Sequence, residues 1–232
     1  MSTDEFHVIA LPTGEFTFPA DYDAYQGQSG VVVAYAIRHA GGVFLFDTGF
    51  APAGPDLEPF YGNWAIRPRD MFEVLAEAGI DRAEITAIAN SHLHLDHSGG
   101  NYRFPGVPIY VQRAEWAAGH ETDYTYLPSI DFPGATYHEL EGEAEPVPGV
   151  HILPTPGHAP GHQSLVLDTP DGVLILAGQA AYTSGEWAGI PDAREGASVA
   201  RERAAYDRSV ARLKALNPKR VLFGHDEKGW PY

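Results

Sequence analysis

The chain of 232 residues contains no cysteine. This absence excludes disulfide scaffolds, thiolate metal sites and cysteine nucleophiles. A metal site in this chain would have to be built from nitrogen and oxygen donors, which histidine and the acidic side chains provide.

Positive charge is scarce as well. Lysine and arginine together number 15, against 31 aspartates and glutamates, and the formal net charge is −16. A field of this sign repels phosphate backbones and anionic membrane surfaces, so we expect neither a nucleic acid nor a membrane as a partner. A neutral or zwitterionic small molecule fits better, although acidity can also serve solubility alone.

Long apolar runs are missing. No run approaches the length that spans a bilayer, and the acidic N-terminus lacks the apolar segment of a secretory signal. Internal repeats and long Pro/Ser-rich linkers are also absent from the sequence. We therefore predict a cytoplasmic location and a single domain over residues 1–232, and a homodimer stays open.

Short β-rich runs dominate the chain, with few helical patterns between them. We predict strands over residues 31–38, 43–47, 85–90, 109–111, 151–154, 164–168, 173–177 and 220–223. We predict helices over residues 70–78, 113–118 and 197–216, and loops over 51–69 and 124–137. Because the order is strands, helices, strands and helix, it favours an α/β fold of packed sheets with helices outside, rather than a regular βαβ sheet.

Four metal-capable side chains lie within six residues, directly after the predicted strand 85–90. They are His92, His94, Asp96 and His97. His92 and His94 alternate, so an extended backbone points both the same way, whereas the other two turn away with the chain. A surface turn with chance histidines could account for any one of them, but not for four at this spacing. Imidazoles and carboxylates are donors that Zn²⁺ accepts, and a catalytic zinc keeps a position open for water.

The motif His-Leu-His-Leu-Asp-His at 92–97 does not stand alone. His158 lies in the segment TPGHAPGHQS, His225 in FGHD and Asp47 in LFDTG. Together these pieces resemble the metallo-β-lactamase superfamily, over about residues 30 to 226. The resemblance implies a four-layer αββα sandwich.

The resemblance also implies a centre of one or two metal ions. The first ion would be held by His92, His94 and His158, and the second by Asp96, His97 and His225. Asp47 would stand behind a ligand histidine and orient it, and His162 would support the ligands from behind or serve the structure rather than bind a metal. Zinc is the expected metal, with iron, cobalt and manganese as alternatives. The remaining histidines lack motif support: His7, His39, His120, His138 and His151.

One position departs from the superfamily pattern. After the predicted strand 173–177 the family carries an aspartate that bridges both ions, and this chain has Gln179 there. Glutamine is neutral and its amide oxygen is a weak donor, so Gln179 is a doubtful ligand and the second ion should bind more weakly. The chain also lacks a carboxyl for proton transfer at this point, a role worth ~10²–10⁴-fold in rate. A weakly active metal-binding homologue is therefore one alternative.

Within the superfamily, two features resemble the quorum-quenching N-acyl-homoserine lactone lactonases. They are the segment HAPGHQS that begins at His158 and Tyr182, three residues after Gln179. The resemblance implies a metal-dependent hydrolase that opens a lactone ring with hydroxide generated on the metal. Tyr182 and a metal would stabilise the oxyanion, and either a metal-bound water or Asp96 would supply a proton to the leaving oxygen. Another ester or lactone hydrolase of the same superfamily is the other alternative.

An acyl chain would need an apolar groove beside the metals. We predict that Leu95, Phe60 and Trp64 line it. Tyr61, Trp116 and Trp187 are further candidates.

Overall fold

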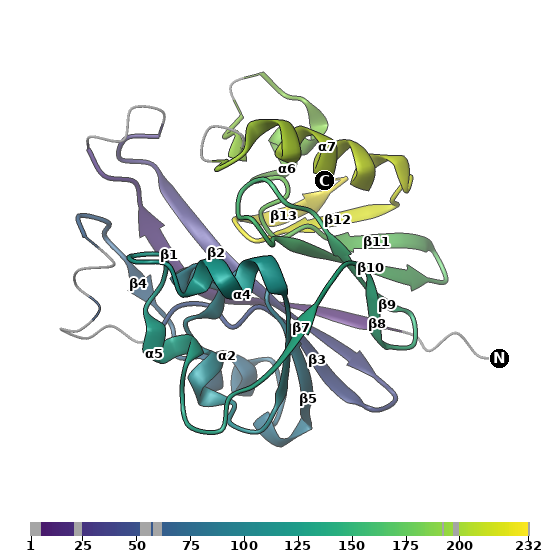
Figure 1. Cartoon of the computed structure of the whole chain (residues 1–232). Coiled ribbons are helices and arrows are strands. Elements are labelled where there is room, and N and C mark those ends of the chain that lie inside the picture. The colour runs from purple at the N-terminus through teal and green to yellow at the C-terminus, as the bar shows by residue number, and fades with distance from the viewer. Residues whose placement is uncertain are drawn as a thin grey trace.

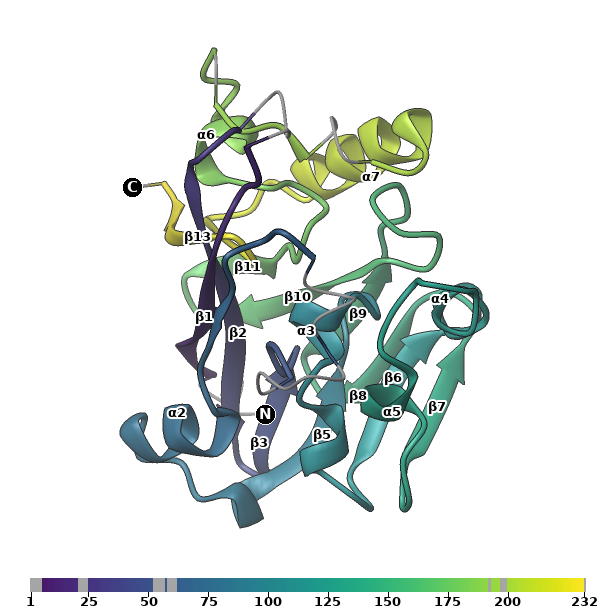
Figure 2. The same ribbon diagram turned by 90° about the vertical axis from the view of Figure 1, so that its left-hand side faces the viewer.

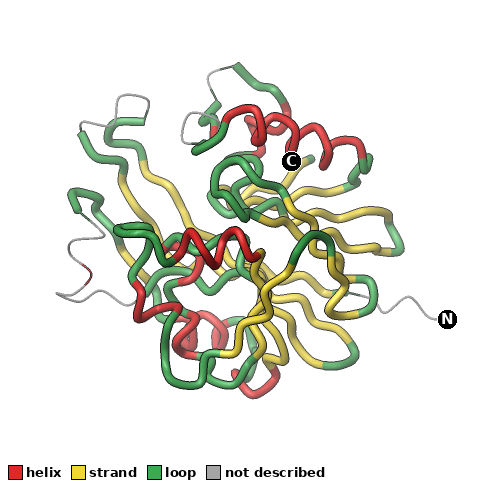
Figure 3. The backbone as a smooth tube through the Cα atoms, viewed as in Figure 1, coloured by secondary structure: helices red, strands yellow, loops and turns green. Residues whose placement is uncertain are grey.

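The computed structural model describes residues 6–20, 25–51, 57, 62–191, 193–196 and 200–231. Within these ranges the chain forms two β-sheets that pack face to face, with helices on both outer sides (Figures 1 and 3). The predicted α/β class and the four-layer αββα sandwich are confirmed by this arrangement.

The first sheet has the strand order β4-β1-β2-β3-β5-β6-β7. Its strands are β1 (His7–Thr17), β2 (Ser29–His39), β3 (Gly42–Phe46), β4 (Arg67–Pro68), β5 (Ile85–Ala89), β6 (Pro108–Gln112) and β7 (Thr136–Leu140). The strands from β4 to β3 pair antiparallel, whereas those from β3 to β7 pair parallel. The parallel half therefore sends several strand ends to the same edge of the sheet.

The second sheet has the strand order β13-β12-β11-β10-β9-β8. Its strands are β8 (Ala144–Val147), β9 (Val150–Pro154), β10 (Gln163–Thr169), β11 (Gly172–Leu176), β12 (Arg220–Phe223) and β13 (Asp226–Trp230). Only the pair β11 and β12 runs parallel within this sheet.

The core lies between the two sheets. Alternate residues of a strand point to opposite faces, and β2 shows this with Val33, Tyr35 and Ile37 facing the second sheet. On that side they pack against residues such as Ile152 and Leu165. The intervening Ala34 and Ala36 belong to a separate cluster on the outer face.

The helices cover the two outer faces. They are α2 (Met71–Glu77), α3 (Leu95–Ser98), α4 (Arg113–Gly119), α5 (Leu127–Ile130), α6 (Ser184–Ala188) and α7 (Arg203–Ala215), with 3₁₀ turns at Arg82–Glu84 and Asn101–Arg103. Helices α2, α4 and α5 lie against the first sheet and α6 and α7 against the second (Figures 1 and 2). In the described part of the chain, none of these helices has the length and apolarity needed to cross a bilayer.

Several elements differ from the sequence prediction. Helix α7 begins at Arg203 rather than at residue 197, because the Glu202 side chain caps it by accepting from the amides of Ala204 and Ala205. The predicted loop 124–137 contains α5 and the start of β7. Strands β1, β8 and β13 and helix α6 were not predicted. In β1, Pro12 and Gly14 interrupt the pattern, and the pairing with β2 absorbs them at a register shift.

Candidate metal centre

Six of the predicted site residues gather at one edge of the sandwich. His92 and His94 follow β5, and Asp96 and His97 lie in α3. His158 comes from the connection between β9 and β10, and His225 from the turn between β12 and β13. Within each sheet, parallel strands end at the same edge. Strand β5 of the first sheet and strand β12 of the second both end at this edge of the sandwich, so the residues that follow them lie close together.

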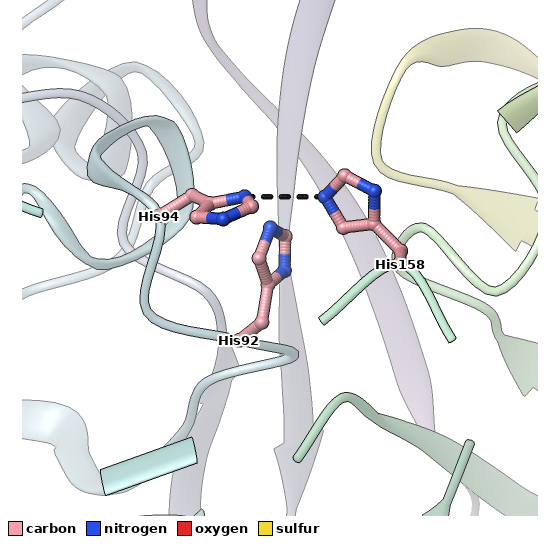
Figure 4. Close-up of side chains that lie close together, drawn as sticks. All are labelled: His92, His94 and His158. Carbon is pink, nitrogen blue, oxygen red and sulfur yellow. Dashed lines mark hydrogen bonds between the residues drawn. The ribbon is translucent and has the colours of Figure 1, made fainter. Parts of the chain in front are cut away.

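The first cluster consists of His92, His94 and His158 (Figure 4). Each offers a ring nitrogen, and the three donor atoms lie within 4.8 Å of one another. His158 Nε2 and His94 Nδ1 are 3.1 Å apart. His92 is fully buried, and its Nε2 has no hydrogen-bond partner among the described residues. Three ring nitrogens that lie this close together form a site suited to a cation that accepts nitrogen donors.

The second cluster consists of Asp96, His97 and His225. Asp96 Oδ2 lies 3.3 Å from His97 Nε2 and 3.5 Å from His225 Nε2, and the two imidazole nitrogens are 3.2 Å apart. The rings of His92 and His97 have centroids 4.2 Å apart, so the two clusters are neighbours.

Hydrogen bonds behind the clusters set which ring nitrogen is free. Nδ1 of His225 donates to the carbonyl of Val31 at 2.8 Å, and Nδ1 of His97 donates to Asp47 Oδ2 at 2.8 Å. In both rings this turns Nε2 toward the cluster, where it can bind a metal once it carries no proton. Buried carbonyls and carboxylates commonly orient metal-binding imidazoles in this way.

Burial and the neighbouring charges set the protonation of these groups. Burial lowers the pKa of His94 and of His225 to about 4, so both rings are neutral and able to bind a metal. Burial also lowers the pKa of His97, but the carboxylates of Asp96 and Asp47 outweigh this effect and raise it to about 10. In the ion-free protein a proton therefore sits on His97, where a cation would take its place.

Comparison with known protein families identifies the family of this chain. Residues 28–225 match the model of the metallo-beta-lactamase superfamily. The chain belongs to the metallo-β-lactamase superfamily. Members of this superfamily are hydrolases that bind divalent metals, so the predicted family and the predicted class of metal-dependent hydrolase are confirmed.

Similar members of the superfamily are lactonases. The chain is 36% identical to an N-acyl homoserine lactonase of Bacillus cereus over 215 residues, which cover 85% of this chain and 83% of the relative. A solved structure of a Bacillus thuringiensis AiiA variant with N-decanoyl-L-homoserine at its active site has a TM-score of 0.78 and 30% identity, covering 97% and 95% of the two chains. A structure of an N-acyl homoserine lactone hydrolase with N-hexanoyl-L-homoserine at the catalytic metal centre has a TM-score of 0.77 and 30% identity, covering 98% and 95%.

Gln179, which the sequence pattern predicts to replace the bridging aspartate of the superfamily, lies in the turn that follows β11. Its side chain is 5% exposed, and Oε1 has no partner in the described part of the molecule. Its backbone N–H donates to His162 Nε2 at 2.9 Å, and His162 Nδ1 lies 2.8 Å from Thr155 Oγ1. Both nitrogens of His162 are thus engaged, and the ring supports the Gln179 turn instead of pointing a free nitrogen at the clusters.

The turn before Gln179 requires glycine. Gly178 has φ +59°, and a Cβ there would lie 2.7 Å from the Ser91 Cβ and 2.8 Å from His162 Nε2. Asp47 also has a positive φ, of 66°, which costs energy in a residue other than glycine. Its carboxylate accepts from the N–H of Ser91 at 2.6 Å, which fixes it behind His97.

Tyr182 lies beside the second cluster. Its ring stacks on His225, with centroids 4.6 Å apart and an interplanar angle of 22°. Its N–H donates to Glu186 Oε2 at 2.5 Å, and Glu186 Oε1 accepts from the Tyr206 hydroxyl at 2.9 Å. These contacts fix the position of Tyr182 from behind.

The predicted groove residues divide into three groups. Leu95 is buried against Ala51 and Leu57, and Trp64 packs on Phe16 and Phe18. Phe60 and Tyr61 lie outside the described residues. The other two candidates pack elsewhere: Trp116, a residue of α4, packs on Tyr137, and Trp187 packs on Phe223 and Trp230.

Two residues beside the first cluster were not predicted. Glu115 is completely buried, and the ring of Tyr124 lies against His94 with centroids 4.8 Å apart. A glutamate in the first turn of a helix normally faces solvent, so the sequence pattern carried no signal for its burial. The histidines without motif support do not enter either cluster.

Proposed function

We propose that this protein is a metal-dependent lactonase that hydrolyses the ring ester of N-acyl homoserine lactones. The observation that carries the proposal is the convergence of five histidines and Asp96 at one edge of the sandwich, in a chain 36% identical to an N-acyl homoserine lactonase. Two related solved structures hold acyl-homoserine products, and this supports a small-molecule substrate of the same chemistry for this chain.

The donor set fits a divalent metal. Buried polar atoms are nearly always hydrogen-bonded, yet His92 Nε2 and Gln179 Oε1 have no partner among the described residues. The first ion would be held by His92, His94 and His158, and the second by Asp96, His97 and His225. Zinc is the proposed metal because the donors are imidazoles and a carboxylate; iron, cobalt and manganese accept the same donors. A bound ion supplies Lewis acidity, which lowers the pKa of water to near ~7 and polarises a carbonyl.

The side chains around the clusters perform the remaining steps. The Tyr182 hydroxyl donates to the lactone carbonyl oxygen as negative charge develops on it. Asp96 takes the proton released as water adds to the carbonyl carbon and returns it to the ring oxygen when the C–O bond breaks. Water is consumed, and the product carries one new hydroxyl and one carboxylic acid, which releases its proton to solvent and becomes a carboxylate. Leu95 and Trp64 offer apolar surface for the acyl chain.

Gln179 favours one second candidate, a weakly active metal-binding homologue. Asp96 is the only carboxylate in the proposed ligand set, so two divalent ions would face a single negative charge. The second ion should accordingly bind more weakly than in a member of the family with a bridging aspartate.

A substrate panel with metal analysis tests these proposals. The protein is supplied with Zn²⁺, its ion content is measured by elemental analysis, and ring opening is followed for acyl-homoserine lactones, γ- and δ-lactones and aryl esters. Turnover of the acyl-homoserine lactones above the other classes is the expected result. Bound metal without turnover would favour the second candidate, and two tightly held ions per chain would contradict the weak second site. The single domain, the homodimer and the cytoplasmic location stay predictions.

A further inference from the structure

The first cluster depends on two segments that are distant in sequence. His94 Nδ1 and His158 Nε2 lie 3.1 Å apart although their residues are separated by 64 positions. The His158 ring is not held through its outer nitrogen, because Nδ1 has no hydrogen-bond partner in the ranges that the structure describes. Apart from its contact with His94, the His158 ring therefore depends for its placement largely on the main chain that carries it.

Glu115 binds the main chain on both sides of the cluster. Its Oε1 accepts from the N–H of Leu93 at 2.8 Å, and its Oε2 accepts from the N–H of Gly161 at 2.9 Å. Leu93 lies between His92 and His94, whereas Gly161 lies three residues after His158. One buried side chain thus joins the two segments that supply the first cluster.

A third contact reaches His94 from the side. The Tyr124 hydroxyl donates to Glu115 Oε1 at 2.5 Å, and the Tyr124 ring lies against the His94 ring. Helix α4 approaches the His158 segment closely, because a Cβ on Gly161 would lie 2.3 Å from the backbone nitrogen of Glu115. These three donors are all satisfied only by a side chain whose two terminal atoms both accept hydrogen bonds, and a carboxylate is such a group.

We propose that Glu115 is a positioning residue for metal binding, which sets the spacing of His94 and His158 through the main chain and through Tyr124. This inference rests on the proposed metal centre and not on the lactone substrate. Glu115 is not itself a ligand, since its oxygens are occupied by the three donors. The competing interpretation is a structural carboxylate that only docks α4 onto the sandwich.

The variant Glu115→Gln separates these interpretations. Its amide nitrogen cannot accept, so at least one of the three donors loses its partner while the size of the side chain is kept. We expect Zn²⁺ affinity, measured by competition with a chromophoric chelator, to fall ~10–100-fold, as for other residues that support metal ligands. The visible absorption spectrum of the Co²⁺-loaded protein should change as well, because it reports ligand geometry. Glu121→Gln, which removes an exposed ion pair with Arg201, is the matched control and should leave both readouts unchanged.

Double variants show which cluster is affected. In a His158→Ala background the first cluster is already broken, so Glu115→Gln should cause no further loss of Zn²⁺ affinity. In an Asp96→Asn background the first cluster is intact, and the full loss should remain. An equal loss in both backgrounds, or a Glu115→Gln protein with wild-type Zn²⁺ affinity and Co²⁺ spectrum, would overturn the inference.

Tyr124→Phe keeps the test decisive if Glu115→Gln fails to fold. It removes one donor and leaves the carboxylate with both main-chain contacts, so a loss of a few-fold in Zn²⁺ affinity is expected. Unchanged affinity and an unchanged Co²⁺ spectrum in this variant would contradict the positioning role. A wild-type protein that retains neither Zn²⁺ nor Co²⁺ would instead refute the proposed metal centre itself.

Discussion

The two metal-ligand clusters are neighbours, but they are held in different ways. In the second cluster a carboxylate touches a ligand ring directly: Asp47 accepts from His97 Nδ1 and is itself fixed by Ser91. In the first cluster the buried carboxylate of Glu115 contacts the main chain beside the ligands. A direct contact changes the basicity of a ring as well as its orientation, whereas a main-chain contact changes only where the ring lies.

The clusters also differ in charge. The second contains Asp96 and is backed by Asp47, whereas the first consists of three imidazoles. Burial lowers the pKa of His92 and of His158 well below the usual value, so the first cluster is neutral without its ion. The second cluster attracts a cation by charge, and the first binds one by geometry. Changes in charge should therefore act mainly on the second cluster, and changes in main-chain position mainly on the first.

The largest effect is expected where the two clusters meet. His92 belongs to both groups of donors that lie within 4.8 Å, with His94 and His158 in one and with Asp96 and His97 in the other. His92→Ala should therefore reduce the content of both ions and bring lactone hydrolysis to the level of the metal-free protein. Elemental analysis and a lactone assay measure this. His151→Ala is the control, since the His151 side chain pairs with Asp168 at the surface and belongs to neither cluster. Full occupancy of the second cluster in His92→Ala would show that the clusters are independent.

The variant Tyr182→Phe tests the role of a side chain beside the second cluster. Tyr182→Phe keeps the ring that stacks on His225 and removes only the hydroxyl. Loss of one donor to a developing oxyanion costs about 10²–10³-fold in kcat where that donor acts alone, and we expect about the lower figure here. Metal content should stay constant, as elemental analysis would show. Wild-type kcat in this variant would remove Tyr182 from the reaction.

The variant Asp47→Asn tests whether direct support of a ligand ring differs from support through the main chain. Asp47→Asn removes the charge behind His97, so the basicity of that ring falls and its ion is bound ~10–100-fold more weakly. The Co²⁺ spectrum should change in the second cluster, while the dependence of the first cluster on Glu115 stays the same. Chelator competition in the single and double variants measures both. If Asp47→Asn weakened both clusters equally, the two modes of support would not be separate.

The sequence predicted the second cluster's support better than the first's. Asp47 was predicted because it ends an early strand within a local pattern, and His162 because it lies four residues after His158. Glu115 and Tyr124 lie in a helix and a loop whose local patterns indicate an exposed or merely aromatic surface. Their function arises from contacts with Leu93 and Gly161 across the fold, and no local periodicity encodes such contacts.

The same limit applies to the fold. The buried central strands were predicted with nearly correct bounds, because short apolar runs rich in β-branched and aromatic residues, such as residues 43–46, are typical of buried strands. The edge strand β13 carries Asp226, Glu227 and Lys228, and its pairing with β12 depends on a neighbour instead of on its own composition. Trp116 and Trp187, two candidates for the groove, pack on Tyr137 and on Phe223 and Trp230, since an aromatic residue alone does not reveal which face of a sheet it will cover.

The smallest expected effect concerns Gln179, which leaves the clusters with one carboxylate. Gln179→Asp adds a negative charge at the turn held by His162 and should raise the affinity for the more weakly bound ion about tenfold. Gln179→Asn is the matched control, because it shortens the side chain equally without adding the charge. Stepwise Zn²⁺ titration against a chelator distinguishes the two variants. If the aspartate and asparagine variants bind the weaker ion equally, charge at this position does not limit metal loading. Charge would then act on the clusters through Asp96 and Asp47 and not through position 179.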